Sequence, residues 1–413
     1  MLKRNLYFNP ITGEFRFDQE YGQFTDIPQT ISWQPDDGIN KKAYGFKNLT
    51  LNLTMNCNLQ CKYCWQQHGC CPDMTKQVID RWLDFFLDEK CNSPAKVLYF
   101  GGEPLLRLDL IQYSSEHVAE ICKKRGIKKP QQQIFTNATL LSDEAIALVK
   151  KEGIYLILSI DGNDEINSLN RVDPYGKSVQ QQIHDGIQRL KQQGVPFGVC
   201  STMSDIEFNV DKTIRYIIEE IHPTSIEFNV RYDRDFMNKY RNSSELSFSS
   251  FFQAWDLIRE SDVENVNFKK RIRPLALRKP LQNSSSGSKN KIAIMPDGKV
   301  SPFNSAIQYP NLQIDPVGDW LAGFRTQWKR NILLGNQCRN CTAAFICGQG
   351  SAFSSFLEYG DFMHVPFLHC EYCAAMMTYV MRTLRNTLGN TVPEGYVVST
   401  EDIVQIFKLS IAK

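Results

Sequence analysis

Between residues 48 and 230 the sequence alternates short runs that favour β-strands with longer stretches of amphipathic helical pattern. The β-prone runs are Leu49–Met55, Lys96–Phe100, Gln132–Thr136, Ile154–Ile160, Phe197–Thr202 and Ser225–Val230. The helical stretches between them are Thr75–Glu89, Asp109–Lys124, Asp143–Lys151, Ser178–Gln193 and Asn209–Ile221. This alternation predicts an α/β fold built from βαβ units with a parallel sheet. Because such crossovers are right-handed, six of them predict an open, partial (β/α)6 barrel.

The composition of the whole chain narrows the class of protein. Its 413 residues include 47 basic and 45 acidic ones, so the net charge of +2 gives no strong field toward nucleic acid or anionic lipid. No apolar run is long enough to span a membrane, and the N-terminus lacks the apolar core of a signal peptide. Thirteen cysteines without a secretory signal favour metal or redox chemistry in a reducing compartment. We therefore predict a cytoplasmic protein with no nucleic-acid or membrane partner.

Three cysteines, Cys57, Cys61 and Cys64, follow the first β-prone run on one short loop. Active sites on parallel sheets lie at the carboxyl ends of the strands, which is where this loop is expected. Thiolates are the usual ligands of iron–sulfur clusters, which normally take four, so three would leave one iron open. The alternative is a partial zinc site, for which His68, Cys70 and Cys71 are the nearest further ligands.

Polar residues and glycines follow three of the other β-prone runs. Gly101-Gly102-Glu103-Pro104 comes after the second run, Thr136-Asn137 ends the third, and Ser159-Ile160-Asp161-Gly162 ends the fourth. Glycines let backbone approach a ligand closely, and a carboxylate beside exposed backbone can accept from an ammonium group. A glycine pair alone usually marks a turn. The prediction of a ligand site therefore depends on the order of these segments along the sheet.

Together, the cysteine spacing, Tyr63 before the third cysteine and the GGEP segment resemble the radical S-adenosylmethionine (SAM) superfamily. The resemblance implies a 4Fe–4S cluster on Cys57, Cys61 and Cys64 whose open iron is chelated by the amino and carboxylate groups of SAM. It places SAM against Tyr63, Gly101, Gly102, Glu103, Thr136, Asn137, Ser159 and Asp161, with Arg171 as a carboxylate partner. It also implies a flavodoxin-like electron donor and a 5′-deoxyadenosyl radical that removes a hydrogen atom from carbon.

A second group of cysteines lies beyond a polar stretch, Asn283–Ser288, and a predicted hairpin that turns at Pro296-Asp297-Gly298. The spacing of Cys338, Cys341, Cys347 and Cys370 resembles the auxiliary-cluster (SPASM) domain of radical SAM enzymes that act on peptides. Ser286, Phe303 and Ser351 stand where the family has thiolates of a first auxiliary cluster. The resemblance therefore implies one auxiliary 4Fe–4S cluster, fully ligated by those four cysteines. The alternative is a structural zinc ion in the same four thiolates.

The resemblance implies a peptide substrate, a ribosomally made precursor. Oxidising relatives often carry an acidic residue where this chain has Asn304. With the first auxiliary cluster missing as well, a redox-neutral epimerisation of L- to D-residues is expected, with Cys373 as a catalytic hydrogen-atom donor. Cross-linking of side chains through C–C or C–S bonds is the alternative, as is a non-catalytic cluster-bearing scaffold. Cys373 could equally be a structural thiol, and Cys122 and Cys200 lie in apolar segments expected in the core.

These observations predict five regions. Residues 1–45 form a β-hairpin extension packed on the barrel, with strands at Leu6–Phe8 and Phe15–Phe17. The remaining regions are the barrel (46–235), a bridging region (236–285), a SPASM-like domain (286–376) and C-terminal helices (377–413). The charged segment Tyr232–Ser244 is expected to be a loop.

Overall fold

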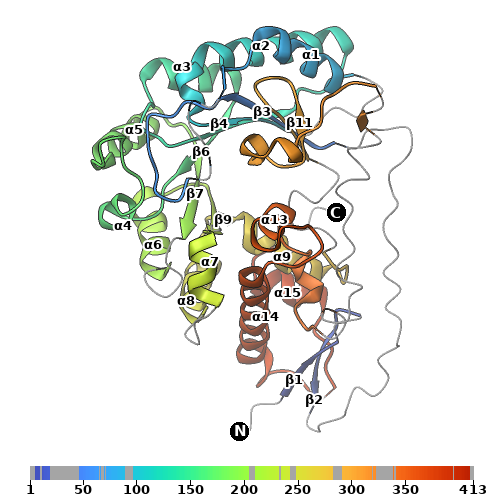
Figure 1. Ribbon diagram of the computed structural model, residues 1–413. Coiled ribbons are helices and arrows are strands. Elements are labelled where there is room, and N and C mark those ends of the chain that lie inside the picture. The colour runs from blue at the N-terminus through green and yellow to red at the C-terminus, as the bar shows by residue number, and fades with distance from the viewer. Residues whose placement is uncertain are drawn as a thin grey trace.

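The computed structural model describes residues 5–9, 12–18, 46–64, 66, 69, 71–88, 96–203, 210–231, 234–241, 248–281, 291–318, 320–321, 338, 341–393 and 395–409. Its central feature is a curved nine-stranded sheet (Figure 1) with the order β11-β10-β3-β4-β5-β6-β7-β8-β9. The six strands in the middle are mutually parallel: β3 (Asn48–Thr54), β4 (Lys96–Gly101), β5 (Gln131–Thr136), β6 (Tyr155–Ser159), β7 (Phe197–Met203) and β8 (Ser225–Val230). The predicted partial barrel of parallel strands is confirmed.

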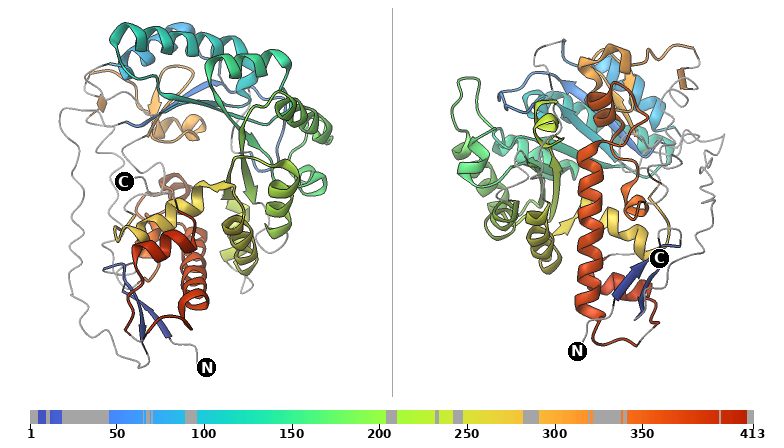
Figure 2. Two further views of the ribbon diagram at one scale, coloured as in Figure 1. Left: turned by 180° about the vertical axis from the view of Figure 1, so that it is seen from behind. Right: turned by 60° about the horizontal axis from the view of Figure 1, so that its bottom comes forward.

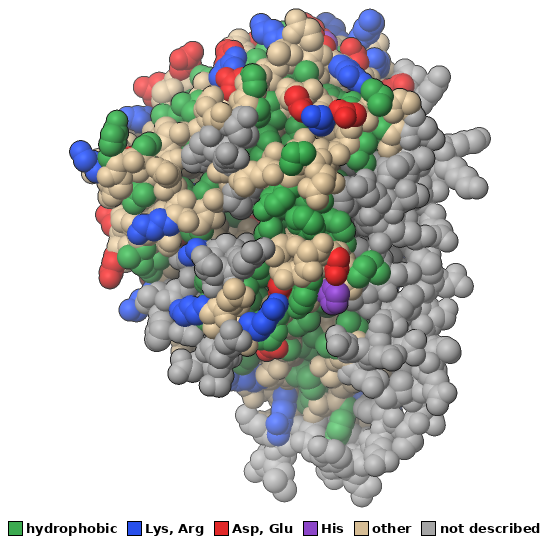
Figure 3. Space-filling model, viewed as in Figure 1, with side chains coloured by type: hydrophobic (Ala, Val, Ile, Leu, Met, Phe, Trp, Pro, Cys, Tyr) green, Lys and Arg blue, Asp and Glu red, His purple; other side chains and the backbone are tan. Residues whose placement is uncertain are grey.

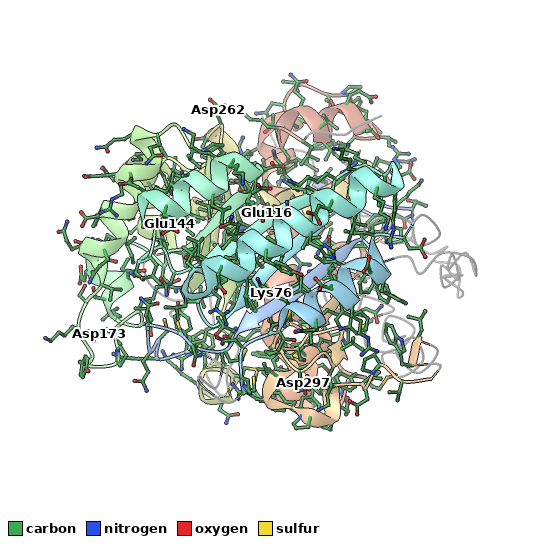
Figure 4. All side chains as sticks on the ribbon, turned by 90° about the horizontal axis from the view of Figure 1, so that it is seen from above. Lys76, Glu116, Glu144, Asp173, Asp262 and Asp297 are labelled. Atoms are coloured by element: carbon green, nitrogen blue, oxygen red, sulfur yellow. The ribbon has the colours of Figure 1, made fainter. Side chains whose placement is uncertain are left out.

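Helices cover the outer face of this sheet (Figure 2). They are α1 (Lys76–Phe86), α2 (Leu108–Arg125), α3 (Asp143–Glu152), α4 (Asp164–Ser168), α5 (Gln180–Gln192) and α6 (Val210–Tyr216), the last continued by a π-turn, Ile217–Ile221. The Thr75 and Ser142 side chains cap α1 and α3 by accepting from backbone N–H groups. Lys76, Glu116 and Glu144 lie along this outer layer (Figure 4), so its polar side meets solvent.

Both edges of the sheet are extended by segments from later in the chain. The predicted hairpin forms as β10 (Lys291–Ile294) and β11 (Val300–Ser301), and β10 pairs in parallel with β3. Asn52 Nδ2 donates to the Ile294 carbonyl at 3.0 Å and fixes this edge. At the other edge β9 (Glu264–Asn265) pairs with β8. The hairpin of the predicted SPASM-like region therefore shares one sheet with the barrel.

The second half of the described chain is helical: α7 (Arg234–Arg241), α8 (Ser249–Glu260), α9 (Val266–Ala276), α12 (Ala344–Cys347), α13 (Ala352–Tyr359), α14 (Phe367–Leu388) and α15 (Thr400–Ile406). Helix α7 corrects the loop expected over Tyr232–Ser244, because Phe236 and Tyr240 bury one side of this charged segment. Helix α14 is continuous across residues 376 and 377, where we had expected a boundary.

The N-terminal hairpin consists of β1 (Asn5–Phe8) and β2 (Phe15–Asp18), as predicted. Its expected packing on the barrel is wrong. Phe17 N donates to the Tyr396 carbonyl at 3.0 Å, and the Phe8 ring lies 5.9 Å from that of Phe345. The aromatic hairpin thus completes the core around the C-terminal helices.

On the face drawn in Figure 3, charged side chains of both signs are scattered and no described region is dominated by one sign. Among the described residues, no helix has the length and apolar character needed to cross a membrane.

Candidate functional site

The three-cysteine loop lies at the carboxyl end of β3, as expected. Its backbone is tied to the segment after α4, because Gln60 N donates to the Val172 carbonyl at 2.8 Å and Lys62 N to the Asn170 carbonyl at 2.9 Å. Leu59, 1% exposed, anchors the loop in the core. Cys57 and Cys61 are half-buried and Cys64 is exposed.

The three thiols influence one another electrostatically. Burial raises the pKa of Cys57 to about 12, and Cys61 and Cys64 raise it further, against the Leu59 N–H that donates to the sulfur. Desolvation by the surrounding protein atoms likewise raises the pKa of Cys61 and, although that residue is exposed, of Cys64. Thiols gathered this way ionise only when a metal compensates their charge, so the donor set fits an iron–sulfur cluster with three protein ligands. Cys71 is half-buried, whereas His68 and Cys70 lie outside the described residues.

Gly101 and Gly102 bring the end of β4 against the backbone of the cysteine loop. Gly102 N donates to the Thr54 carbonyl at 2.8 Å and Glu103 N to the Asn56 carbonyl at 2.9 Å. A Cβ atom at Gly101, where φ is +135°, would lie 2.0 Å from Thr54 O, and one at Gly102 would lie 2.2 Å from Asn56 O. Both glycines are therefore required by this close approach, whichever ligand binds beside them.

Glu103, two residues after the end of β4, is fully buried. Its Oε1 accepts from Leu105 N at 3.0 Å and the Thr136 hydroxyl at 2.8 Å, and its Oε2 accepts from Asn137 N at 2.7 Å. Burial raises the pKa of Glu103 to about 7 despite these donors. A carboxylate offers about four acceptor positions, so Oε2 retains capacity for a further donor such as an ammonium group.

Asn137 links this carboxylate to the cysteine loop. Its Nδ2 donates to Asn58 Oδ1 at 2.9 Å and lies 3.9 Å from Cys57 Sγ, while its Oδ1 accepts from Thr139 N at 3.0 Å. Thr136 and Asn137, predicted from the third strand, thus lie directly beside Glu103 and Cys57.

Asp161 and Arg171 form a buried ion pair under the loop. Arg171 donates to the two carboxylate oxygens of Asp161 at 2.9 and 3.2 Å, and Thr202 N donates to Oδ1 at 2.8 Å. The Tyr63 hydroxyl donates to Asp161 Oδ2, and the Arg171 guanidinium lies 5.6 Å from the Tyr63 ring. Of the predicted SAM residues, Tyr63, Asp161 and Arg171 thus form one group, with Ser159 on the strand that leads to it.

Cys200 is one residue that the sequence reasoning misplaced. It lies beside Ser159 in the sheet register, on the inner face of the barrel, and accepts from Asn229 Nδ2 at 3.4 Å. Asp161 and Arg171 are near enough to influence its pKa, which burial raises. Residues two apart in a strand share a face, so Cys200 lies on the same face as Gly198 and Thr202 and opposite to Val199. The sequence contained this alternation, and it could have predicted the placement of Cys200.

The second group of cysteines also gathers. Burial raises the pKa of Cys370 to about 12, with Cys347, Cys338 and Cys341 raising it further. Cys341 N donates to the Cys338 carbonyl at 3.2 Å, Cys347 ends α12, and Cys370 lies in the first turn of α14. Four thiols that influence one another electrostatically are a candidate four-thiolate metal site.

Phe303 and Ser351, which stand where the SPASM pattern has thiolates of a first auxiliary cluster, make other contacts in this fold. Phe303, 1% exposed, packs against the Phe353 and Phe362 rings at 5.8 and 5.9 Å in a separate apolar cluster. The Ser351 side chain caps α13 by accepting from Ser354 N. Ser286 lies outside the described residues.

Cys373 lies one helical turn after Cys370 and is 1% exposed. Its sulfur is 3.4 Å from His369 Nε2 and accepts from Arg271 Nη1 at 3.5 Å. Ligand atoms of Cys347, His369 and Cys373 all lie within 4.8 Å of one another. His369 was missed by the sequence analysis, although it directly precedes Cys370. Cys373 therefore adjoins the second cysteine group.

Several known proteins resemble part of this chain. The radical SAM superfamily matches residues 51–221. An uncharacterized protein of Methanocaldococcus jannaschii is 30% identical over 175 residues, covering 42% of this chain and 59% of that protein. The serine-type anaerobic sulfatase-maturating enzyme of Bacteroides thetaiotaomicron is 29% identical over 180 residues, covering 42% of this chain and 43% of that one. The chain thus spans about half the length of the curated relatives it matches.

Two solved structures share the fold. The structure of anSMEcpe with bound AdoMet superposes with a TM-score of 0.64 at 17% identity, over 84% of this chain and all of that one. Streptococcus suis SuiB bound to precursor peptide SuiA gives 0.55 at 15% identity, over 79% and 76%. The radical SAM superfamily uses a 4Fe–4S cluster and SAM. The radical SAM family model thus covers residues 51–221, the part of the chain that holds the three-cysteine loop, Glu103 and the Asp161–Arg171 pair.

Proposed function

We propose that this chain is a radical SAM enzyme that modifies a ribosomally made precursor peptide. The observation that carries the proposal is the meeting of the Cys57–Cys64 loop with Glu103, Asn137 and the Asp161–Arg171 pair at one edge of the barrel. The likeness to SuiB, solved with a precursor peptide, and to sulfatase-maturating enzymes supports a peptide or protein substrate. When bound, the cluster and SAM supply the radical that removes a hydrogen atom from carbon.

The chain's own residues would bind and orient these groups. Cys57, Cys61 and Cys64 hold the cluster, and the remaining acceptor position on Glu103 Oε2 suits the SAM ammonium. Gly101, Gly102, Thr136, Asn137 and Ser159 shape the wall around it. Asp161 and Arg171 act as positioning residues, because their pair fixes Tyr63 and thereby the cysteine loop.

We further propose one auxiliary 4Fe–4S cluster on Cys338, Cys341, Cys347 and Cys370. Replacing Cys370 with alanine is expected to remove roughly four irons per chain, since a cluster needs its thiolates. The matched variant Cys373→Ala is expected to retain them. Iron, sulfide and zinc are measured in anaerobically reconstituted protein. One zinc per chain in place of iron would establish the structural-zinc alternative.

For the outcome on the peptide we propose redox-neutral epimerisation of L- to D-residues. The aromatic packing around Phe303 supports it, because a cluster that could take a further electron from the substrate has no place there. A thiol returns hydrogen to the opposite face of the carbon, and the resulting thiyl radical is reduced by one electron and one proton, the electron coming from a flavodoxin-like protein. The alternative is a cross-link, which requires net oxidation of the peptide.

The donor test compares two cysteines. The enzyme, SAM and a reductant act anaerobically on the precursor peptide encoded nearest the gene, in heavy water, and tandem mass spectrometry follows the product. Epimerisation adds one deuterium per modified residue, whereas a cross-link removes two hydrogens. If Cys373 is the donor, Cys373→Ala abolishes deuterium gain while Cys200→Ala retains it. The reverse result would move the role to Cys200, which lies on the inner face of the barrel. Absence of 5′-deoxyadenosine altogether would favour a non-catalytic scaffold.

A further inference from the structure

On the inner face of the sheet, lysines stand at the amino ends of two strands, and the candidate site lies at the opposite, carboxyl ends. Lys291, Asn48 and Lys96 are register partners on β10, β3 and β4, so the two lysines stand on one face with a single residue between them. Glu227 is on the same face, because the register runs from Cys200 on β7 to Glu227 on β8. Lys96 and Lys291 begin their strands, whereas the cysteine loop and Glu103 lie beyond the opposite ends.

The curl of the sheet brings these charges into range of one another. In the strand order β4 and β8 are four places apart, yet Glu227 acts on Lys96 across the barrel. Burial lowers the pKa of Lys96, Lys291 lowers it further, and Glu227 opposes them. Residues from both sides of the barrel therefore face a common region.

Helix α9 adds one more cation, Lys270, to this region, whereas the neighbouring Arg271 donates to the Ile346 and Cys347 carbonyls. Burial lowers the pKa of Lys270 to about 8, with Lys291 and Arg271 acting in the same direction and Glu227 opposing. Lys270 is nevertheless solvent-exposed. Its ammonium is thus crowded by protein atoms while water still reaches it, and at pH 7 it is mainly protonated.

Lys96, Lys270 and Lys291 place three positive charges around one carboxylate, Glu227. Cations collected in a partly desolvated region favour an anion that can accept several charge-assisted hydrogen bonds. The same face leads to the SAM residues, since Cys200 is influenced by Glu227 and by the Asp161–Arg171 pair.

We propose that Lys96, Lys270 and Lys291 bind a carboxylate of the peptide substrate. The substrate class rests on the proposed function. A strand rises about 3.3 Å per residue, so Lys96 and its register neighbour Lys291 lie roughly 17 Å below the carboxyl end of β4, about five residues of extended peptide. The carboxylate is then either an acidic side chain about five residues from the modified position or the C-terminus of the peptide.

Binding of small probes to the full-length enzyme, reconstituted and loaded with SAM but without reductant, tests the assignment by calorimetry. N-acetyl-glutamate amide and N-acetyl-glutamine amide differ only in charge, and N-acetyl-alanine presents a terminal carboxylate. We expect the acidic probes to bind at millimolar concentration, roughly tenfold or more tightly than the glutamine probe. Lys270→Gln and Lys96→Gln each weaken binding by roughly tenfold, Glu227→Gln strengthens it, and Lys123→Gln on the outer helix α2 leaves it unchanged.

Equal binding of the glutamate and glutamine probes, no binding of either acid, or equal effects of Lys270→Gln and Lys123→Gln would overturn the assignment. A variant that fails to fold would bind the probes more weakly. Because Glu227→Gln is expected to bind them more tightly, it distinguishes the loss of one charge from the loss of folding. Preference for the glutamate probe identifies a side chain as the source, and preference for N-acetyl-alanine identifies a C-terminus. Because no turnover is needed, failure of the proposed function appears separately, as an unmodified peptide with probe binding intact.

Discussion

Replacing Cys61 with alanine is expected to abolish formation of 5′-deoxyadenosine and to remove roughly four irons per chain. The loop provides three thiols for the cluster, and no fourth is available among its described neighbours to replace Cys61 except the half-buried Cys71. Iron analysis and chromatography of the nucleoside product, both under anaerobic conditions, measure the two effects together.

Cys122→Ala is the matched control for this loss. Cys122 is 5% exposed in α2 and lies in the core, as its apolar surroundings predicted. Its replacement costs some packing but leaves the iron content and SAM cleavage in place. A Cys61→Ala protein that kept its iron and cleaved SAM would refute the three-cysteine assignment.

Replacing Asp161 with alanine is expected to lower the free energy of unfolding by about 3–5 kcal/mol. The loss leaves Arg171 charged and without this partner in a position where its side chain is 8% exposed. It also removes the acceptor of the Tyr63 hydroxyl and of Thr202 N. Urea denaturation of the protein without cofactors gives the change directly.

The surface pair Arg215–Glu219 provides the comparison, since both side chains are about half exposed. Glu219→Ala is expected to cost only about 0.3–0.5 kcal/mol, because solvent screens such a pair. Equal losses in the two variants would mean that the Asp161–Arg171 pair contributes no more than a surface contact.

The barrel was predictable because each strand and helix has its own local signal. Strand β8 has the predicted bounds, Ser225–Val230, and the Thr75 cap precedes α1 as the hydrophobic period indicates. Helix α7 was not predictable from the sequence. Most of its residues are charged or polar, and few apolar side chains, such as Phe236 and Tyr240, mark its buried side. The packing of the N-terminal hairpin on the C-terminal helices depends on partners hundreds of residues away, which local patterns do not report.

In the candidate site, the residue types and their order along the sheet could be predicted from the sequence, whereas their hydrogen-bond partners could not. The sequence identified Glu103 as a carboxylate after β4, but only the fold reveals that Asn137 N and Thr136 satisfy it in a buried setting. Cys200 shows the same limit. Its strand, Phe197–Met203, contains several apolar residues, but strand alternation turns Cys200 to the inner face.

The pairing of β10 with β3 has a consequence for how this chain folds during synthesis. The bond between Asn52 and Ile294 joins residues 242 positions apart. At translation rates of about 5–20 residues per second, β3 waits roughly 12–50 s for its partner. During that time a strand that carries three leucines, next to the cysteine loop, presents unpaired N–H and C=O groups, which is a template for aggregation. Soluble yield should therefore depend on what shields this edge in the nascent chain.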